Sequence, residues 1–141
     1  GRRTRMIVRW PGTVGAGEVS EAVWWFADVL PTLAELGGGK VPEGVDGVSV
    51  APLLKGEEWE PGERLLYWEF FEGGFRQAAR WGDWKVIRPK VGAALQLYDL
   101  REDVGEKVNV AGEHPEVERM LEEKVNGARR PSVHWPTALD E

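Results

Sequence analysis

The chain has 141 residues, of which 42% are hydrophobic, and a formal net charge of −6. This is one domain's worth of chain with enough apolar residues for a core, and its acidity argues against a general nucleic-acid binder. Cysteine is absent, which excludes disulfides and thiolate chemistry, and no apolar run approaches the roughly 20 residues of a membrane span. We therefore expect no nucleic-acid partner and no membrane span.

The first segment with a clear pattern is a short apolar run close to the start of the chain. A strand is predicted over residues 6–10. Pro11-Gly12 ends it, because proline cannot donate a backbone hydrogen bond to a neighbouring strand. A buried strand seldom begins a domain so abruptly. We therefore do not expect Gly1 to be the natural start of the fold.

A helix is predicted over residues 28–36. Asp28 is a candidate N-cap, Pro31 falls in the first turn, and glycines 37–39 end the helix. Leu30 and Leu33 share one helical face with Leu36, and we expect this face to pack in the core. Further on, Ser49 is expected to cap a single helical turn through Leu54.

The second half of the chain reads as short strands separated by turn residues. Gly73-Gly74 and Gly82-Asp83 are the turn signals, since glycine readily adopts the positive φ of tight hairpins. The flanking runs are rich in aromatic and β-branched residues or alternate between apolar and polar residues. The predicted strands of this antiparallel meander are Leu66–Phe71, Phe75–Trp81, Trp84–Arg88 and Leu95–Leu100.

A second helix is predicted to start at His114-Pro115 and to stop at Asn126-Gly127. Its apolar residues recur at helical spacing, so they should lie on the sheet. These residues are Val117, Met120, Leu121 and Val125. The fold class is therefore α+β, with an antiparallel sheet of about four strands packed on a C-terminal helix, followed by an irregular tail over residues 129–141.

Residues that could carry catalysis are scarce. His114 and His134 have no second histidine or cysteine at ligand spacing, so neither is expected to bind metal. Asp99, Asp103 and Glu106 are scattered as in a calcium loop, but the glycine and terminal glutamate of such a loop are missing, and turn formation is the preferred interpretation. No phosphate-binding loop and no nucleophile elbow is present.

The eight tryptophans allow two interpretations. Exposed rings could stack on sugars, whereas rings on strands are more simply explained by burial in the core. Trp59 and Trp135 lie in polar, loop-like surroundings. We expect these two to be exposed.

A series of short motifs resembles the later half of the sulfatase family, in particular arylsulfatases and the C-terminal region of N-sulphoglucosamine sulphohydrolases. The motifs occur in the family's order and cover nearly the whole chain. They are Met6–Gly12, Asp28–Leu33, Asp46–Ser49 with Pro52–Leu54, Arg80–Lys85, and Leu97–Leu100 with Asp103, Glu106 and Asn109.

This resemblance implies that residues 1–60 are the end of an alkaline-phosphatase-like α/β domain, with its last strand and helix, and that residues 61–141 are a C-terminal subdomain. It also implies sulfate-ester hydrolysis by a formylglycine nucleophile and a calcium ion in the full-length family member. Formylglycine is made from the first residue of a Cys/Ser-x-Pro-x-Arg motif, which this chain lacks. We therefore expect no cofactor and no catalytic residue in this chain, and no activity from it alone.

The resemblance implies a role in completing the substrate cleft of an N-terminal catalytic half, with a sulfated glycan or an aryl sulfate as substrate and a periplasmic or secreted location. The residues expected to line the cleft are Arg3, Glu72, Arg76 and Trp81. The alternative is a non-catalytic module in which the tryptophans bind carbohydrate or protein.

Overall fold

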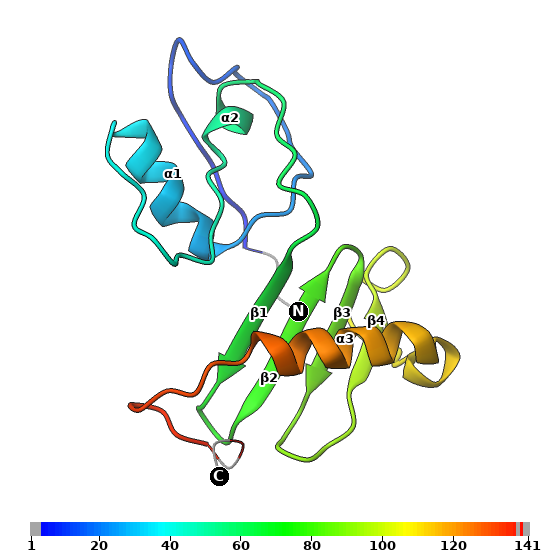
Figure 1. Cartoon of the computed structure of the whole chain (residues 1–141). Coiled ribbons are helices and arrows are strands. Elements are labelled where there is room, and N and C mark those ends of the chain that lie inside the picture. Colours follow the sequence, from blue (N-terminus) through cyan, green and yellow to red (C-terminus); the bar gives the residue numbers. More distant parts are fainter. Residues whose placement is uncertain (1–3, 138, 140–141) are drawn as a thin grey trace. The chain divides into compact units, whose positions relative to one another are not determined.

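An antiparallel sheet dominates the second half of the chain in the computed structural model, which describes residues 4–137 and 139 (Figure 1). Its strands lie side by side in sequence order. They are β1 (Leu65–Phe70), β2 (Arg76–Trp81), β3 (Trp84–Arg88) and β4 (Gln96–Asp99). The predicted four-stranded meander is confirmed, because each strand lies where the pattern placed it.

Glycines make the two hairpin turns that set the register. Gly73 and Gly74 adopt φ values of 69° and 107° between β1 and β2. Gly82 adopts φ 60° in the two-residue turn that brings Trp81 opposite Trp84. Side chains other than glycine rarely adopt such positive φ values, so these turns favour one strand pairing over its neighbours.

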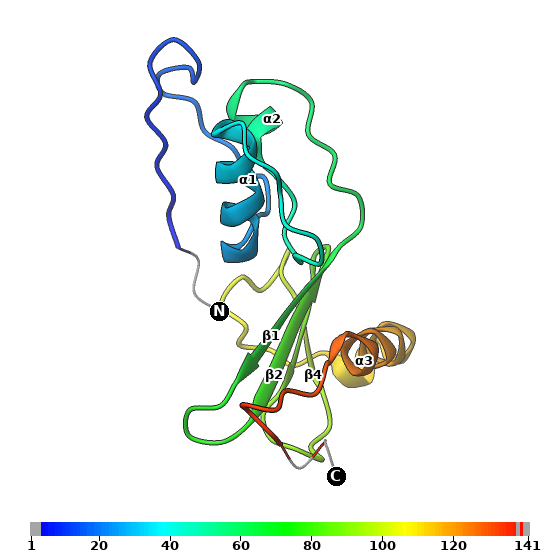
Figure 2. The same cartoon turned by 60° about the vertical axis from the view of Figure 1, so that its left-hand side comes forward.

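One face of the sheet carries the core. Ala79, Val86 and Leu97 stand next to one another across β2, β3 and β4, and all three are fully buried. The helix α3 (Pro115–Ala128) crosses this face and adds Leu121 and Val125, which are also buried (Figure 2). Full burial of each such large aliphatic side chain contributes roughly 1.5–3 kcal/mol, so these contacts hold α3 on the sheet.

The ends of α3 follow the expected rules with one difference. Pro115 occupies the first turn, and the amide of Glu118 donates to the carbonyl of His114 at 3.0 Å. The helix continues through Gly127 to Ala128, past the predicted stop. Glycine costs only about 1 kcal/mol in a helix interior relative to alanine, so the packing of the last turn on the sheet can outweigh it.

The first half of the chain forms a separate compact unit that ends at Gly62, and the second unit begins at Glu63. The first unit contains a short 3-10 turn (Phe26–Asp28), the helix α1 (Val29–Leu36) and the helical turn α2 (Ala51–Leu54). The hydroxyl of Ser49 accepts a hydrogen bond from the amide of Ala51 at 3.1 Å, but the N-cap of α2 is Val50, so Ser49 does not cap this helix as predicted.

Asp28 begins α1 as predicted, but its side chain does not cap that helix. It is completely buried, and its carboxylate accepts hydrogen bonds from the amides of Trp25 at 3.1 Å and Val48 at 2.8 Å. Thr32 adds to this cluster, since its hydroxyl donates to the carbonyl of Asp28 at 2.6 Å and accepts from the amide of Val50 at 2.9 Å. Together these bonds tie the loop before α2 to the start of α1.

Two expectations for this unit are wrong. Residues 6–10 have no regular secondary structure, because a strand needs a backbone partner and no segment within residues 4–137 pairs with them. The leucine face of α1 is not packed as a core either, since Leu30 and Leu33 are 52% and 63% exposed. Helical spacing predicted the apolar face correctly, but it does not say which segment covers that face.

Candidate functional site at the β1–β2 hairpin

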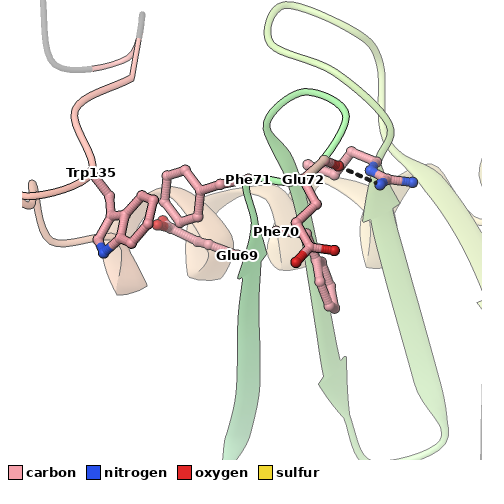
Figure 3. Close-up of a pocket in the computed structure, with 6 residues that line it drawn as sticks. Glu69, Phe70, Phe71, Glu72 and Trp135 are labelled. Atoms are coloured by element: carbon pink, nitrogen blue, oxygen red, sulfur yellow. Dashed lines mark hydrogen bonds between the residues drawn. The ribbon is translucent and has the colours of Figure 1, made fainter.

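The end of the β1–β2 hairpin and the C-terminal tail form an open pocket of about 400 Å³ (Figure 3). The pocket is lined by Glu69, Phe70, Phe71, Glu72, Arg76 and Trp135. Two of the predicted cleft residues, Glu72 and Arg76, therefore come together here. The guanidinium of Arg76 donates to the backbone carbonyl of Glu72 at 2.9 Å, which holds it across the hairpin turn.

The other two predicted cleft residues do not belong to this group. Trp81 lies at the opposite end of β2, roughly 16 Å from Arg76 along the strand. It is half-buried against the core, and the ammonium of Lys124 lies 4.8 Å from its ring centre. Arg3 lies outside the described residues. The structure thus unites the turn residues of the predicted set and separates Trp81 from them.

Aromatic rings form the side of the pocket that sequence reasoning missed. The ring of Phe71 lies 5.6 Å from that of Trp135 and 5.4 Å from that of Phe75. Trp135 is 61% exposed, as predicted. The prediction that Trp59 is exposed is wrong, because its side chain is half-buried and its indole N–H donates to the carbonyl of Ser49 at 2.8 Å. Spacing alone could not connect Trp135 with a hairpin some 60 residues earlier.

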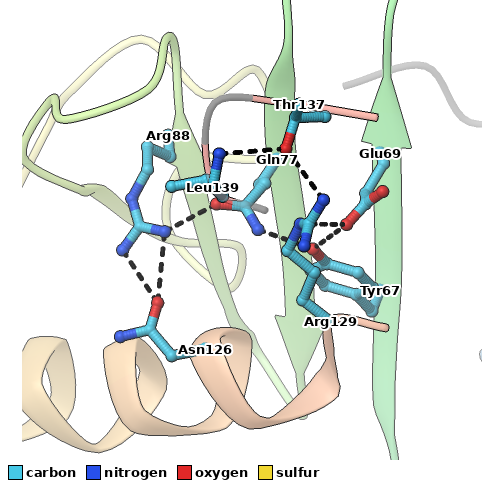
Figure 4. Close-up of polar contacts among 8 residues, drawn as sticks. All are labelled: Tyr67, Glu69, Gln77, Arg88, Asn126, Arg129, Thr137 and Leu139. Carbon is cyan, nitrogen blue, oxygen red and sulfur yellow. Dashed lines mark hydrogen bonds and ion pairs between the residues drawn. The ribbon is translucent and has the colours of Figure 1, made fainter. Parts of the chain in front are cut away.

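A chain of hydrogen bonds fixes the carboxylate of Glu69, which lines the pocket (Figure 4). This carboxylate accepts from the hydroxyl of Tyr67 at 2.6 Å and pairs with the guanidinium of Arg129 at 3.4 Å. The Tyr67 hydroxyl in turn accepts from the amide of Gln77 at 2.6 Å. Burial and the hydrogen bond to Glu69 raise the pKa of Tyr67, so the phenol stays protonated and remains a donor.

The same network ties the sheet and the tail to α3. Arg88 is 8% exposed, and its guanidinium donates to Gln77 at 2.6 Å and to Asn126 on α3 at 3.2 Å. Arg129, just past the end of α3, donates to the hydroxyl of Thr137 at 2.8 Å. Because Thr137 lies two residues after Trp135, this bond holds the tail that carries the tryptophan next to the hairpin.

The acidic residues near β4 are structural. Both carboxylate oxygens of Glu106 accept from the ammonium of Lys85, at 2.7 and 2.8 Å. Asp103 accepts from the backbone amide of Val108 at 2.8 Å, which gives it the predicted turn role. The side chain of Asn109 accepts from the amide of Leu97 at 2.9 Å and so fixes the loop against the edge strand β4.

Two features that other functions would need are absent from the part of the chain that the structure describes. Within residues 4–137, no three histidine or acidic side chains gather closely enough to hold a metal ion. No helix of the described chain is long and apolar enough to cross a membrane.

Comparison with known proteins assigns the chain to one family. The profile of the family described as "N-sulphoglucosamine sulphohydrolase, C-terminal" matches residues 1–131. The chain is 30% identical to an N-acetylgalactosamine-6-O-sulfatase of Bacteroides thetaiotaomicron over 92% of its length, and 30% identical to human arylsulfatase A over 87%. It spans only 28% and 30% of the length of these two relatives.

A solved structure has the same fold. It is described as a protein in complex with its substrate D-glucosamine-2-N,6-O-disulfate, and it superposes with a TM-score of 0.72 at 23% identity. The match covers 84% of this chain and 26% of that one. The expected architecture, an antiparallel sheet with helices at the C-terminal end of an alkaline-phosphatase-like protein, is thereby confirmed.

Proposed function

Since the chain belongs to the sulfatase family, in which it matches the C-terminal region of N-sulphoglucosamine sulphohydrolases, we propose that it completes the substrate cleft of a sulfuric ester hydrolase. One observation carries the proposal: the hairpin brings Glu72 and Arg76 together at the rim of an open pocket. In this proposal residues 1–60 are the end of the α/β domain and residues 61–141 are the small subdomain.

The exposed apolar side chains of the first unit support a larger assembly. Ile7 is 91% exposed and Phe26 is 88% exposed, and Leu30 and Leu33 on α1 are more than half exposed. Contiguous exposed apolar surface usually marks an interface. The relatives are more than three times as long as this chain, so the occupant that we propose is the N-terminal catalytic half of the same protein.

The chemistry is divided accordingly. In this proposal the catalytic half supplies the nucleophile and the calcium ion. What this chain contributes is contact with the substrate. The guanidinium of Arg76 can donate hydrogen bonds to sugar hydroxyls, and the carboxylate of Glu72 can accept hydrogen bonds from them. The substrate that we propose is a sulfated glycan or an aryl sulfate, with its sulfate ester held in the catalytic half.

The first test is to read the coding sequence upstream of Gly1. An in-frame Cys/Ser-x-Pro-x-Arg motif with paired aspartates supports the proposal, and a stop codon or an unrelated sequence overturns it for this chain. The 141-residue chain alone should not hydrolyse 4-nitrophenyl sulfate. Calcium-dependent turnover by it would contradict the division of roles.

The second test uses the full-length protein and a sulfated oligosaccharide. We expect Glu72→Gln and Arg76→Met to raise KM about tenfold or more, because a hydrogen bond to a charged group contributes roughly 1.5–3 kcal/mol. The matched control is Arg119→Met, which removes an exposed arginine on α3, outside the pocket. If the control and the hairpin variants change KM equally, the cleft role is wrong.

The alternative is a non-catalytic carbohydrate- or protein-binding module. The exposed ring of Trp135 at the pocket favours its carbohydrate form. This function replaces the first if no catalytic half is encoded upstream and the chain still binds glycans.

A further inference from the structure

We propose that the pocket at the β1–β2 hairpin binds an uncharged pyranose ring of a glycan, stacked on Trp135. The inference goes beyond sulfate-ester hydrolysis, and it rests on the proposed function only in placing this pocket next to a substrate cleft. The pocket is formed entirely by residues of the unit that begins at Glu63. Binding can therefore be measured without a catalytic half.

The aromatic side of the pocket has the properties of a stacking platform. Trp135 is 61% exposed although its ring is held in place. The Phe71 ring supports it at 5.6 Å with an angle of 38° between the planes, and Phe71 is itself supported by Phe75. Hydrogen bonds also hold the tail around Trp135. The amide of Trp135 donates to the carbonyl of Ser132 at 3.3 Å, and the hydroxyl of Thr137 accepts from the guanidinium of Arg129 at 2.8 Å.

A tryptophan exposed in this way is energetically unfavourable, because apolar surface stays in contact with water. An indole ring buries 150–250 Å² when it packs fully, so leaving most of it in water forfeits a large part of that gain. The apolar C–H face of a pyranose is a flat partner that such a ring can cover. Because the ring is already oriented by Phe71, little conformational entropy would be lost when a ligand stacks on it.

The polar side of the pocket matches hydroxyl groups. Glu69 and Glu72 supply carboxylate oxygens, which accept hydrogen bonds, and Arg76 supplies guanidinium N–H groups, which donate them. A sugar hydroxyl both donates and accepts, so vicinal hydroxyls can bond to both kinds of group. Pockets with aromatic walls and a few fixed polar groups are the usual form of small-molecule sites.

The charges select a neutral ring. The lining has two carboxylates and one guanidinium, and Arg129, which pairs with Glu69 at 3.4 Å, lies behind the pocket wall. A sulfate or carboxylate on the bound sugar would meet Glu72 as well as Arg76, so it would gain little net attraction. The site should therefore bind a desulfated sugar at least as well as its sulfated counterpart.

The test is a titration of the 141-residue chain with a panel of neutral hexasaccharides: cellohexaose, xylohexaose and agarohexaose. Binding is followed through the indole N–H signals in two-dimensional NMR, with the Trp135 signal assigned by its loss in Trp135→Phe. We expect a saturable shift of that signal with at least one of the sugars, and about tenfold weaker binding by Trp135→Ala. Val133→Ala is the matched control, because Val133 lies in the same tail, is 95% exposed and does not line the pocket.

Two results would overturn the inference. One is the absence of a saturable Trp135 shift with every sugar, while the amide signals of Val86 and Leu97 show an intact core. The other is a clear preference for sulfated κ-carrageenan hexaose over its desulfated form. Loss of hydrolysis in the full-length protein would refute the proposed function and leave this titration unchanged, so the two failures are distinguishable.

Discussion

The ion pair between Lys85 and Glu106 gives the sharpest test of how the second unit is held together. It joins β3 to the loop after β4 through two short hydrogen bonds, at 2.7 and 2.8 Å. The side chains are only 16% and 9% exposed, respectively. Replacing Lys85 with methionine would leave the Glu106 carboxylate without this counter-charge in a largely dry position.

Breaking a buried pair from one side costs roughly 3–5 kcal/mol, and partial exposure reduces the expected loss for Lys85→Met to about 2–4 kcal/mol. With a urea slope of about 1–2 kcal/mol per M, the unfolding midpoint should fall by roughly 1–4 M. Glu106→Gln should cost less, because the amide keeps one acceptor for Lys85. The double variant should be more stable than the sum of the two losses predicts.

The assay is equilibrium urea unfolding at pH 7 of the four proteins of this double-mutant cycle, followed by tryptophan fluorescence. Arg101→Met is the matched control, since Arg101 pairs with Asp99 at 2.6 Å but is 58% exposed. Water screens that pair, so the control should barely move the midpoint. Equal shifts for Lys85→Met and the control, or strictly additive losses in the cycle, would refute the argument from burial.

The same pair predicts a pH dependence. Burial alone would raise the pKa of Glu106, but hydrogen bonds and nearby positive charge, with Lys85 the first contributor, hold this pKa below its ordinary value. A carboxyl whose folded pKa is lowered stabilises the fold above its unfolded pKa, and the contribution is lost as the pH falls through the folded pKa. The stability difference between the native chain and Lys85→Met should therefore shrink in acid.

Two further predictions concern other parts of the chain. Hydrogen bonds from Arg101 lower the pKa of Asp99 to about 2, so the carboxyl should stay ionised until the pH falls toward 2. A carboxyl NMR titration should show this, and a pKa unmoved by Arg101→Met would contradict it. Gly47→Ala should disrupt the first unit, because the new Cβ would lie 2.0 Å from the carbonyl oxygen of Ala27. Faster amide exchange at Val48 is the expected signal, and unchanged exchange would rule the clash out.

The strand order and the hairpin turns were readable from the sequence because they depend on local patterns. Alternation over residues 84–88 and the paired glycines at 73 and 74 specify extended chain and reversal within a few residues. The start of α3 at Pro115 and its buried face at Leu121 are equally local, since helical spacing decides which side chains meet the sheet.

Only the tertiary structure decided what the local patterns leave open. It placed Trp135 against Phe71, set Trp81 at the end of β2 opposite the hairpin turn, and buried Asp28 as a tie to the loop at Val48 rather than as a cap. Such contacts join residues far apart in the chain, and no periodicity encodes which partner a side chain will meet. The leucines of α1 show the same limit: their spacing predicts an apolar face, but what covers that face depends on chain that packs against it.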